Sequence, residues 1–125
     1  MEEIGLRDFN SITDKAFVID SWMRSFYASS RFTECVPRKE FQTKHLPIIN
    51  RLISKSTVRL AVESDAPEVI LAYAVYEPST LHYVYVKEQF RGFGLCRKLT
   101  EEANFPSCPR VTHLTERGRQ IFRRL

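Results

Sequence analysis

A strand followed by a glycine-containing turn and a helix is the feature that most constrains this chain. Residues 81–87 are mainly apolar and aromatic, glycines follow at Gly92 and Gly94, and Leu95 and Leu99 begin an apolar helical face. Glycine tolerates positive φ angles and lets the backbone approach a ligand closely. The first turn of a helix adds unpaired N–H donors and the positive end of the helix dipole. Such a junction favours an anion such as a pyrophosphate.

Two common nucleotide-binding motifs do not match this junction. A dinucleotide fingerprint needs a third glycine where this chain has Arg97, and no sequence of the P-loop form G-x-x-x-x-G-K-[ST] is present. An ordinary strand-to-helix turn without a ligand is the plainest alternative. Residues 91–96, however, resemble the R/Q-x-x-G-x-G/A signature of the GCN5-related N-acetyltransferases. Cys96 stands in place of the final glycine or alanine.

This resemblance implies that acetyl-CoA donates an acetyl group directly to an amine. In that family, backbone groups of the strand before the loop hold the pantetheine, and amides of the loop hold the pyrophosphate. The corresponding positions in this chain are Val84, Tyr85, Val86, Arg91, Gly92, Phe93, Gly94, Leu95, Cys96 and Arg97. The amine acceptor is not specified by any motif, and it could be a small molecule or a protein.

His82 is the candidate for the catalytic base. An amine with a pKa of about 10.4 must lose a proton before it can attack, and a positioned base assists this step. Some members of the family, such as arylalkylamine acetyltransferases, carry histidine on this strand, and residues 80–86 contain no glutamate. Alternation places His82 and Tyr85 on opposite faces of the strand, so we do not expect them to share a role. A structural role for His82 in the sheet is the alternative.

Tyr85 is the candidate for the acid that protonates the leaving thiolate. The family often uses a tyrosine within a C-terminal F-Y-E-K-x-G pattern, which residues 121–125 echo with Phe122 at the tyrosine position. A phenyl ring cannot donate a proton, so Tyr85 or solvent would have to do so. Cys96 could instead carry the acyl group, although a small buried thiol is the simpler interpretation.

These residues predict an acetyl-CoA-dependent N-acetyltransferase. The alternative is a catalytically impaired CoA-binding or protein-interaction module on the same fold, because Phe122 replaces the usual acid. Turnover of acetyl-CoA would distinguish the two.

The composition fits a single domain that spans residues 1–125. Hydrophobic residues make up 43% of the chain and charged residues 27%, which is typical of globular proteins. No apolar run is long enough for a membrane span, and residues 1–4 lack a signal-peptide pattern. Cys35, Cys96 and Cys108 are widely spaced, which fits reduced thiols, and no Cys/His cluster has metal-ligand spacing. We therefore expect a cytoplasmic protein without a metal.

Positive charge is concentrated near the glycine turn. From residue 91 onward, eight basic residues face three acidic ones, a charge of +5, whereas residues 1–90 carry −1. This distribution would attract a polyanionic cofactor. A nucleic-acid partner is not expected, because no aromatic residues are interleaved with the basic ones and no binding motif is present.

The remaining patterns predict a sheet flanked by helices. Strands are expected at residues 3–9, 57–62, 69–76, 80–87 and 110–115, and helices at about 12–27, 37–53, 94–103 and 116–125. This order resembles the acyl-CoA N-acyltransferase fold, an α/β (α+β) fold with a central, mostly antiparallel mixed sheet, in a short version that ends after the last helix. An open sheet edge could pair two copies into a homodimer.

Two of the expected helices carry predictions about single residues. Asn10 or Ser11 caps the first helix, with Asp14 as the acid of a capping box. Trp22 is a packing residue there, with substrate contact as the alternative, and it lies beside a core stripe of Ile12, Ala16, Ile19, Met23, Phe26 and Tyr27. In the second helix Pro47 should kink or divide the segment. His45 is a structural residue that could also contact substrate.

Overall fold

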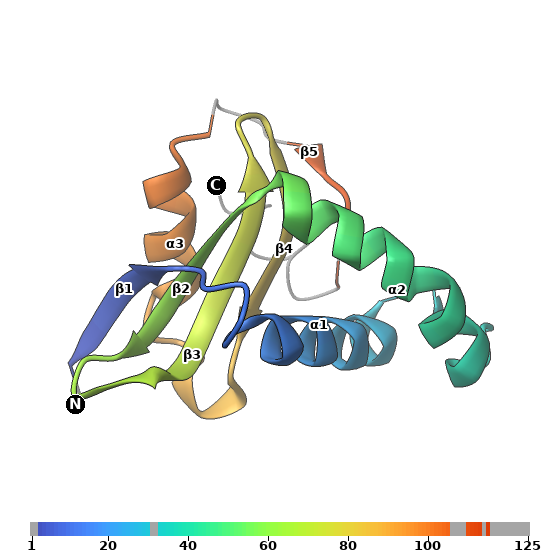
Figure 1. The fold of residues 1–125 in the computed structure, drawn as a ribbon, viewed down its shortest axis with the longest axis horizontal. Helices are drawn as coiled ribbons and strands as arrows, with labels where there is room; N and C mark the ends of the chain where they lie inside the picture. Colours follow the sequence, from blue (N-terminus) through green and yellow to red (C-terminus); the bar gives the residue numbers. More distant parts are fainter. Residues whose placement is uncertain (1–2, 31–32, 106–109, 114, 116–125) are drawn as a thin grey trace.

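The computed structural model describes residues 3–30, 33–105, 110–113 and 115. Its elements, labelled in Figure 1, follow one another as β1 (Ile4–Asp8), α1 (Lys15–Ser29), α2 (Arg38–Lys55), β2 (Thr57–Glu63), β3 (Ala66–Glu77), β4 (Thr80–Val86), the 3-10 turn η2 (Glu88–Phe90), α3 (Leu95–Ala103) and β5 (Arg110–Val111). The expected final helix and Phe122 lie outside the described residues, and so does Cys108.

The five strands form one sheet in the order β1-β2-β3-β4-β5. Strands β1 to β4 pair antiparallel with their neighbours, and β5 pairs parallel with β4 at two positions. The sheet is therefore mixed and mostly antiparallel, as predicted. The described part of β5 covers only the first two residues of the predicted strand.

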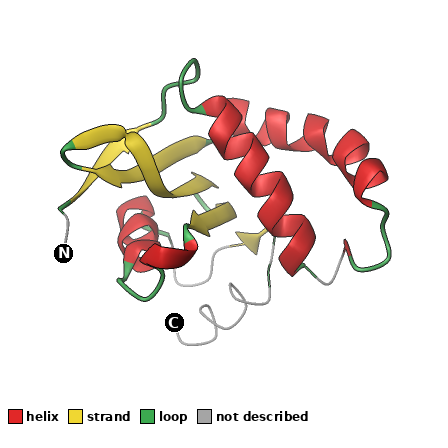
Figure 2. Cartoon of the chain, turned by 90° about the horizontal axis from the view of Figure 1, so that it is seen from below, coloured by secondary structure: helices red, strands yellow, loops and turns green. Residues whose placement is uncertain are grey.

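Helices cover both faces of the sheet, and Figure 2 shows α1 and α2 on one side and α3 on the other. The central strand β3 is buried on both faces, which explains its nearly continuous apolar sequence. Its Tyr73 and Val75 belong to the core under α1 and α2, whereas Ala72 and Ala74 face α3. The sheet thus separates two hydrophobic cores.

Helix α1 begins at Lys15, later than predicted, because Asn10 first organises a separate turn. The Asn10 side-chain oxygen accepts a hydrogen bond from the backbone N–H of Ile12 at 2.9 Å, and the Asn10 carbonyl accepts one from the N–H of Asp14, also at 2.9 Å. Ile12 in this turn is 91% exposed. The prediction that Ile12 starts the core stripe was therefore wrong.

The buried face of α1 is centred on a different row of side chains. These are Val18, Ser21, Trp22, Met23 and Phe26. Trp22 is fully buried and stacks on Tyr83, with their ring centroids 5.1 Å apart. The packing interpretation of Trp22 is confirmed.

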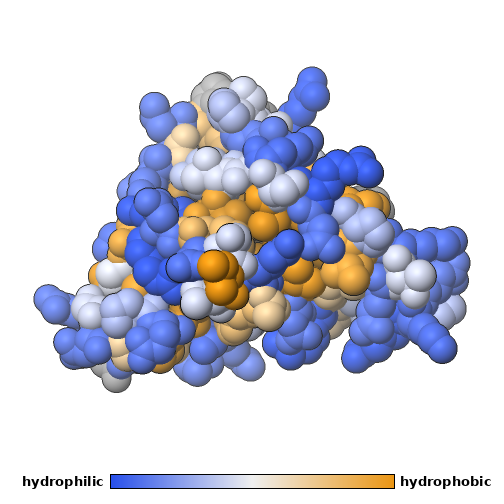
Figure 3. All heavy atoms as spheres, in the orientation of Figure 1, coloured by the Kyte–Doolittle hydropathy of each residue, from blue (hydrophilic) through white to orange (hydrophobic). Residues whose placement is uncertain are grey.

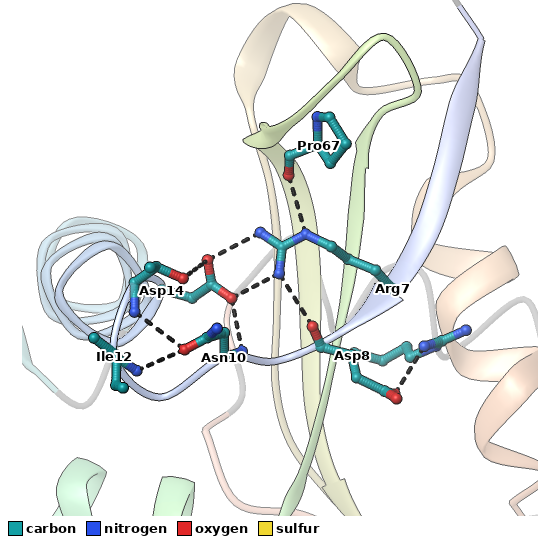
Figure 4. Close-up of polar contacts among 8 residues, drawn as sticks. Arg7, Asp8, Asn10, Ile12, Asp14 and Pro67 are labelled. Carbon is teal, nitrogen blue, oxygen red and sulfur yellow. Dashed lines mark hydrogen bonds and ion pairs between the residues drawn. The ribbon is translucent and has the colours of Figure 1, made fainter.

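Arg7 and Asp14 tie β1 to the start of α1, as Figure 4 shows. Nη1 and Nη2 of Arg7 lie 2.7 and 2.9 Å from the two carboxylate oxygens of Asp14, and Nε of Arg7 donates to the carbonyl of Pro67 at 3.0 Å. The carboxylate also accepts from the backbone N–H of Asn10 at 2.8 Å. Asp14 is itself the N-cap of α1, so the prediction that Asn10 or Ser11 caps the helix was wrong, and the Asp14 side chain instead closes the turn that precedes the helix.

Helix α2 runs without a break from Arg38 to Lys55, so the prediction that Pro47 could divide it was wrong. Proline removes only one helical hydrogen bond. The buried side chains on both sides of it (Phe41, Ile49, Leu52 and Ile53) pack into the core under the helix. This burial holds the helix together across the proline.

The surface in the orientation of Figure 1 is largely hydrophilic, with apolar side chains visible mainly near its middle (Figure 3). The large apolar residues with substantial exposure in the described regions are Ile12, Leu46, Ile48 and Phe93. None of the described helices has both the length and the apolar character that crossing a membrane needs.

Candidate functional site

The glycine turn connects β4 to α3 with the backbone geometry that the sequence predicted. Gly92 has a φ of +87° and Gly94 a φ of +78°, backbone angles that residues other than glycine rarely adopt. A Cβ atom on either glycine would meet nothing within 4 Å. The two glycines therefore border open space.

Backbone donors gather at this turn. Gly94 is the N-cap of α3, and its carbonyl accepts from the N–H of Lys98 at 3.0 Å. Among the described residues, no hydrogen-bond acceptor faces the N–H groups of residues 92–97. Unpaired N–H groups at the start of a helix attract anions. The turn can therefore hold a phosphate-like group through its backbone.

The side chains of the turn divide into exposed and buried groups. Arg91, Phe93 and Arg97 are exposed, whereas Leu95 is buried in the core beneath α3. Burial raises the pKa of the Cys96 thiol. A raised pKa favours the neutral thiol. Cys96 therefore fits the role of a packing residue better than the role of a nucleophile.

The second half of β4 lacks a neighbour on one side within the described residues. Strand β5 pairs with β4 only at Thr80 and Leu81, and the N–H of Thr112 continues this contact to the carbonyl of Leu81 at 3.1 Å. Residues 84–86 pair with β3 alone. Their other edge is where the predicted pantetheine contacts would form.

His82 lies at an irregularity of β4. Val75 and Tyr76, which are consecutive in β3, pair with Tyr83 and Leu81, so the register skips His82 as in a β-bulge. Strict alternation does not hold across such a residue, so alternation alone does not assign a face to His82. Bulges often re-aim a side chain.

The His82 ring is buried, and both of its nitrogens are engaged. Nε2 lies 2.7 Å from Oε2 of Glu77, and Nδ1 lies 2.9 Å from Oγ1 of Thr112. The hydrogen bond from His82 lowers the pKa of the Glu77 carboxyl, so Glu77 is a carboxylate near neutral pH. His82 has no free nitrogen for a substrate in this arrangement.

The two predicted catalytic residues do not meet. Tyr85 is half-buried and packs against Tyr73 and Phe17, at ring-centroid distances of 5.4 and 6.2 Å. The neighbouring Tyr83 is buried, which raises the pKa of its hydroxyl to about 12. His82 and Tyr85 thus have different partners, and their separate catalytic roles stay a prediction.

The sequence did not identify the partners of the histidines. Glu77 precedes the turn into β4, just before the range in which a glutamate was sought, and Thr112 follows β5. His45 packs against the rings of both Phe26 and Phe41, and its Nε2 lies 2.7 Å from Nε2 of His113. The sequence offered one signal, which is that the chain has only three histidines. In the structure, hydrogen bonds connect all three, directly or through Thr112.

No protein-family model matches this sequence, and no curated protein does. Solved structures do match. A candidate acetyl transferase from Pyrococcus furiosus superposes with a TM-score of 0.65 at 15% identity, over 82% of this chain and 72% of the other. The yncA protein from Salmonella typhimurium, solved with its cofactor acetyl-CoA, gives 0.53 at 19% identity, over 81% and 61%. A protein from Rhodopseudomonas palustris, described as a GCN5-related N-acetyltransferase, gives 0.59 at 13% identity, over 83% and 66%.

The chain thus spans between 61% and 72% of the length of these three proteins. Likeness at such low sequence identity shows a shared fold.

Proposed function

Because the chain has the acyl-CoA N-acyltransferase fold of the GCN5-related N-acetyltransferases, we propose that it binds acetyl-CoA and transfers the acetyl group to an amine. The fold itself is as the sequence predicted. The observation that carries the proposal is the set of N–H groups at residues 92–97 that have no partner among the described residues, beside the open space at Gly92 and Gly94. The pyrophosphate of the cofactor would bind there, and the backbone of residues 84–86 would hold the pantetheine.

The side chains around the turn support the same assignment. Arg91 and Arg97 are exposed and positively charged, so they can add to the attraction of a polyanionic cofactor. Nε of Arg91 also donates to the carbonyl of Val86 at 3.1 Å, which fixes the start of the turn against the end of β4. The turn is therefore positioned before any ligand arrives.

Thermal unfolding with acetyl-CoA tests this site. A ligand at about a hundredfold over its Kd stabilises a protein by roughly 2.7 kcal/mol, which should raise the Tm by several degrees. In Gly94→Trp, the indole would occupy the open space beside the turn, and we expect the rise to disappear.

Gly94→Asn is the matched control for backbone strain. Asparagine adopts positive φ more readily than other non-glycine residues, and its side chain is short. This variant should keep most of the rise. An unchanged Tm of the wild type at millimolar acetyl-CoA, or a full rise in Gly94→Trp, would contradict the proposed site.

A binding module on the same fold is the second candidate, and the engagement of both His82 nitrogens favours it. Such a module would show the Tm rise without releasing CoA thiol when amines are added. The cytoplasmic location and the homodimer through a sheet edge stay predictions, and light scattering would check the latter.

A further inference from the structure

All three histidines of the chain belong to one row of hydrogen bonds. From Glu77 at the end of β3, the row passes through His82, then Thr112 and His113 after β5, and ends at His45 on α2. The successive contacts are Glu77 Oε2 to His82 Nε2 at 2.7 Å, His82 Nδ1 to Thr112 Oγ1 at 2.9 Å, Thr112 Oγ1 to His113 Nδ1 at 2.9 Å, and His113 Nε2 to His45 Nε2 at 2.7 Å.

The ionised carboxylate of Glu77 fixes the direction of every hydrogen bond in this row. A carboxylate only accepts, so His82 donates from Nε2 and, as a neutral ring, accepts at Nδ1. The Thr112 hydroxyl gives its one hydrogen to that nitrogen, which at 2.9 Å is closer than its other acceptor, the carbonyl of His82 at 3.5 Å, and accepts from Nδ1–H of His113. His113 then accepts at Nε2 from Nε2–H of His45. All four hydrogens therefore point toward Glu77.

His45 is the outer end of the row. Its Nδ1 has no hydrogen-bond partner among the described residues, and it is not one of their buried unpaired atoms. His45 is half-buried and is the most exposed of the three histidines. His82 and His113 are buried, at 3% and 8% exposed, and both nitrogens of each are engaged. His45 is the histidine that an incoming proton can reach.

We propose that these five side chains form a proton relay with Nδ1 of His45 as its entrance. A proton that binds Nδ1 of His45 lets Nε2–H move to His113, Nδ1–H of His113 move to Thr112, and the hydroxyl hydrogen of Thr112 move to His82. The net result is an imidazolium at His82 beside the carboxylate of Glu77. The three hydrogen bonds between His45 and His82 reverse their direction, the bond from Nε2–H of His82 to Glu77 keeps its direction, and none is lost.

The surroundings favour charge at the Glu77 end of the relay. The rings from α1 and α2 that pack against His45 and His113 are uncharged and belong to Trp22, Phe26 and Phe41. Burial lowers the pKa of His45 and, together with the other two histidines, lowers that of His113 to about 4. At the other end of the relay, the Glu77 carboxylate carries a negative charge, and Nζ of Lys55 lies 3.6 Å from its Oε2.

The relay gives the acetyl transfer a route for the proton of the amine. This role rests on the proposed function, because the amine must be deprotonated before it attacks. An amine could not reach a free nitrogen of His82, but it could give its proton to His45. His45, rather than His82, would then be the base that contacts the acceptor, and His82 would be a positioning residue within the relay.

Imidazole ¹⁵N NMR tests the relay without any substrate. At pH 7.5, His82 and His45 should carry hydrogen on Nε2 and His113 on Nδ1. Thr112 is exposed, so the Thr112→Val variant should fold. The substitution removes the hydroxyl that links His82 to His113, and it should let His113 populate the Nε2–H tautomer. Thr112→Ser keeps the hydroxyl and should retain the wild-type tautomers. An Nε2–H tautomer of His113 in the wild type, or no change in Thr112→Val, would overturn the relay.

Thiol release from acetyl-CoA tests the role in transfer, with a polyamine, an arylalkylamine and a lysine peptide as acceptors. His45→Gln should lower the rate at pH 7 at least tenfold, because positioned bases contribute about 10²- to 10⁴-fold, while the Tm rise with acetyl-CoA persists. Ile48→Gln, one turn along α2 at a position 42% exposed, should keep the wild-type rate.

The outcomes separate the two proposals. An unchanged rate in His45→Gln would overturn the role of His45 as base. A wild type that binds acetyl-CoA but releases no thiol with any amine would contradict the acetyl transfer, and the NMR tautomers would then decide the relay by themselves.

Discussion

The Asp14 side chain is only 4% exposed, although it carries a negative charge. Its carboxylate accepts from the Arg7 guanidinium, from the backbone N–H of Asn10 and, at 3.4 Å, from the hydroxyl of Thr13. The hydrogen bonds from Arg7 are the largest cause that lowers the pKa of Asp14. A buried charge of this kind is stabilising only while its partners are present.

Replacing Asp14 by asparagine should therefore destabilise the fold. Asp14→Asn leaves Arg7 without its counter-charge, and we expect urea denaturation at pH 7 to show a loss of about 2 kcal/mol. Asp20→Asn is the control, because it breaks the exposed pair with Arg24, where the two side chains are 73% and 62% exposed. Exposed pairs contribute little, so its effect should stay below about 0.5 kcal/mol.

The stability difference between the wild type and Asp14→Asn should depend on pH, because the pKa of Asp14 is lowered in the folded protein. Unfolded chains bind a proton on aspartate near pH 4, whereas folded Asp14 stays ionised to lower pH. Its contribution is therefore present above about pH 4 and is lost as the pH falls further. Equal stability of wild type and Asp14→Asn at pH 7 would contradict the importance of this contact.

The turn that precedes α1 depends on the side chain of Asn10. The Asn10 side-chain oxygen accepts from the backbone N–H groups of Ile12 and Thr13, whereas no hydrogen bond of the Ser11 side chain is found within the described residues. A hydrogen bond of this kind typically contributes about 1 kcal/mol to stability. We expect Asn10→Ala to lower the free energy of unfolding by about that amount.

Ser11→Ala is the matched control for this turn and should change the free energy of unfolding by less than about 0.3 kcal/mol, as is usual for surface positions. Urea denaturation of both variants measures the difference. A larger loss in Ser11→Ala than in Asn10→Ala would mean that the stabilising side chain of the turn is assigned to the wrong residue.

Local pattern was enough to predict the elements whose burial is regular. Strand β4 and helix α3 were predicted within about a residue, because an apolar strand and glycines with positive φ leave few alternatives. The start of α1 was predicted too early, since Ile12 continues the helical period but is exposed. Periodicity alone cannot tell that a separate turn precedes the helix.

The hydrogen bonds of the relay could not be predicted from the sequence. His82 was identified as a candidate, but the bulge that aims it depends on how β4 pairs with β3. Its partner Thr112 is thirty positions away in the sequence, and His113 meets His45 across a separation of 68 positions. Contacts of this kind are set by tertiary packing and leave no local signal.

The two hydrophobic cores share the strands β2 to β4, whose side chains point alternately to the two faces. We propose that residues 1–125 form a single domain in which neither core unfolds alone. Trp22 is the only tryptophan of the chain, and it is fully buried on the side of α1 and α2. Its fluorescence therefore reports on one core, whereas far-UV circular dichroism reports on both.

Leu99→Ala tests this coupling from the opposite face. Leu99 is a fully buried residue of α3, and truncating such a leucine costs about 2 to 4 kcal/mol. If the cores unfold together, the urea midpoints of Trp22 fluorescence and circular dichroism should fall equally, although Trp22 lies across the sheet. Lys98→Ala, an exposed neighbour in α3, should leave both midpoints nearly unchanged. A midpoint that falls by circular dichroism alone would show that α3 and its core unfold as a separate unit.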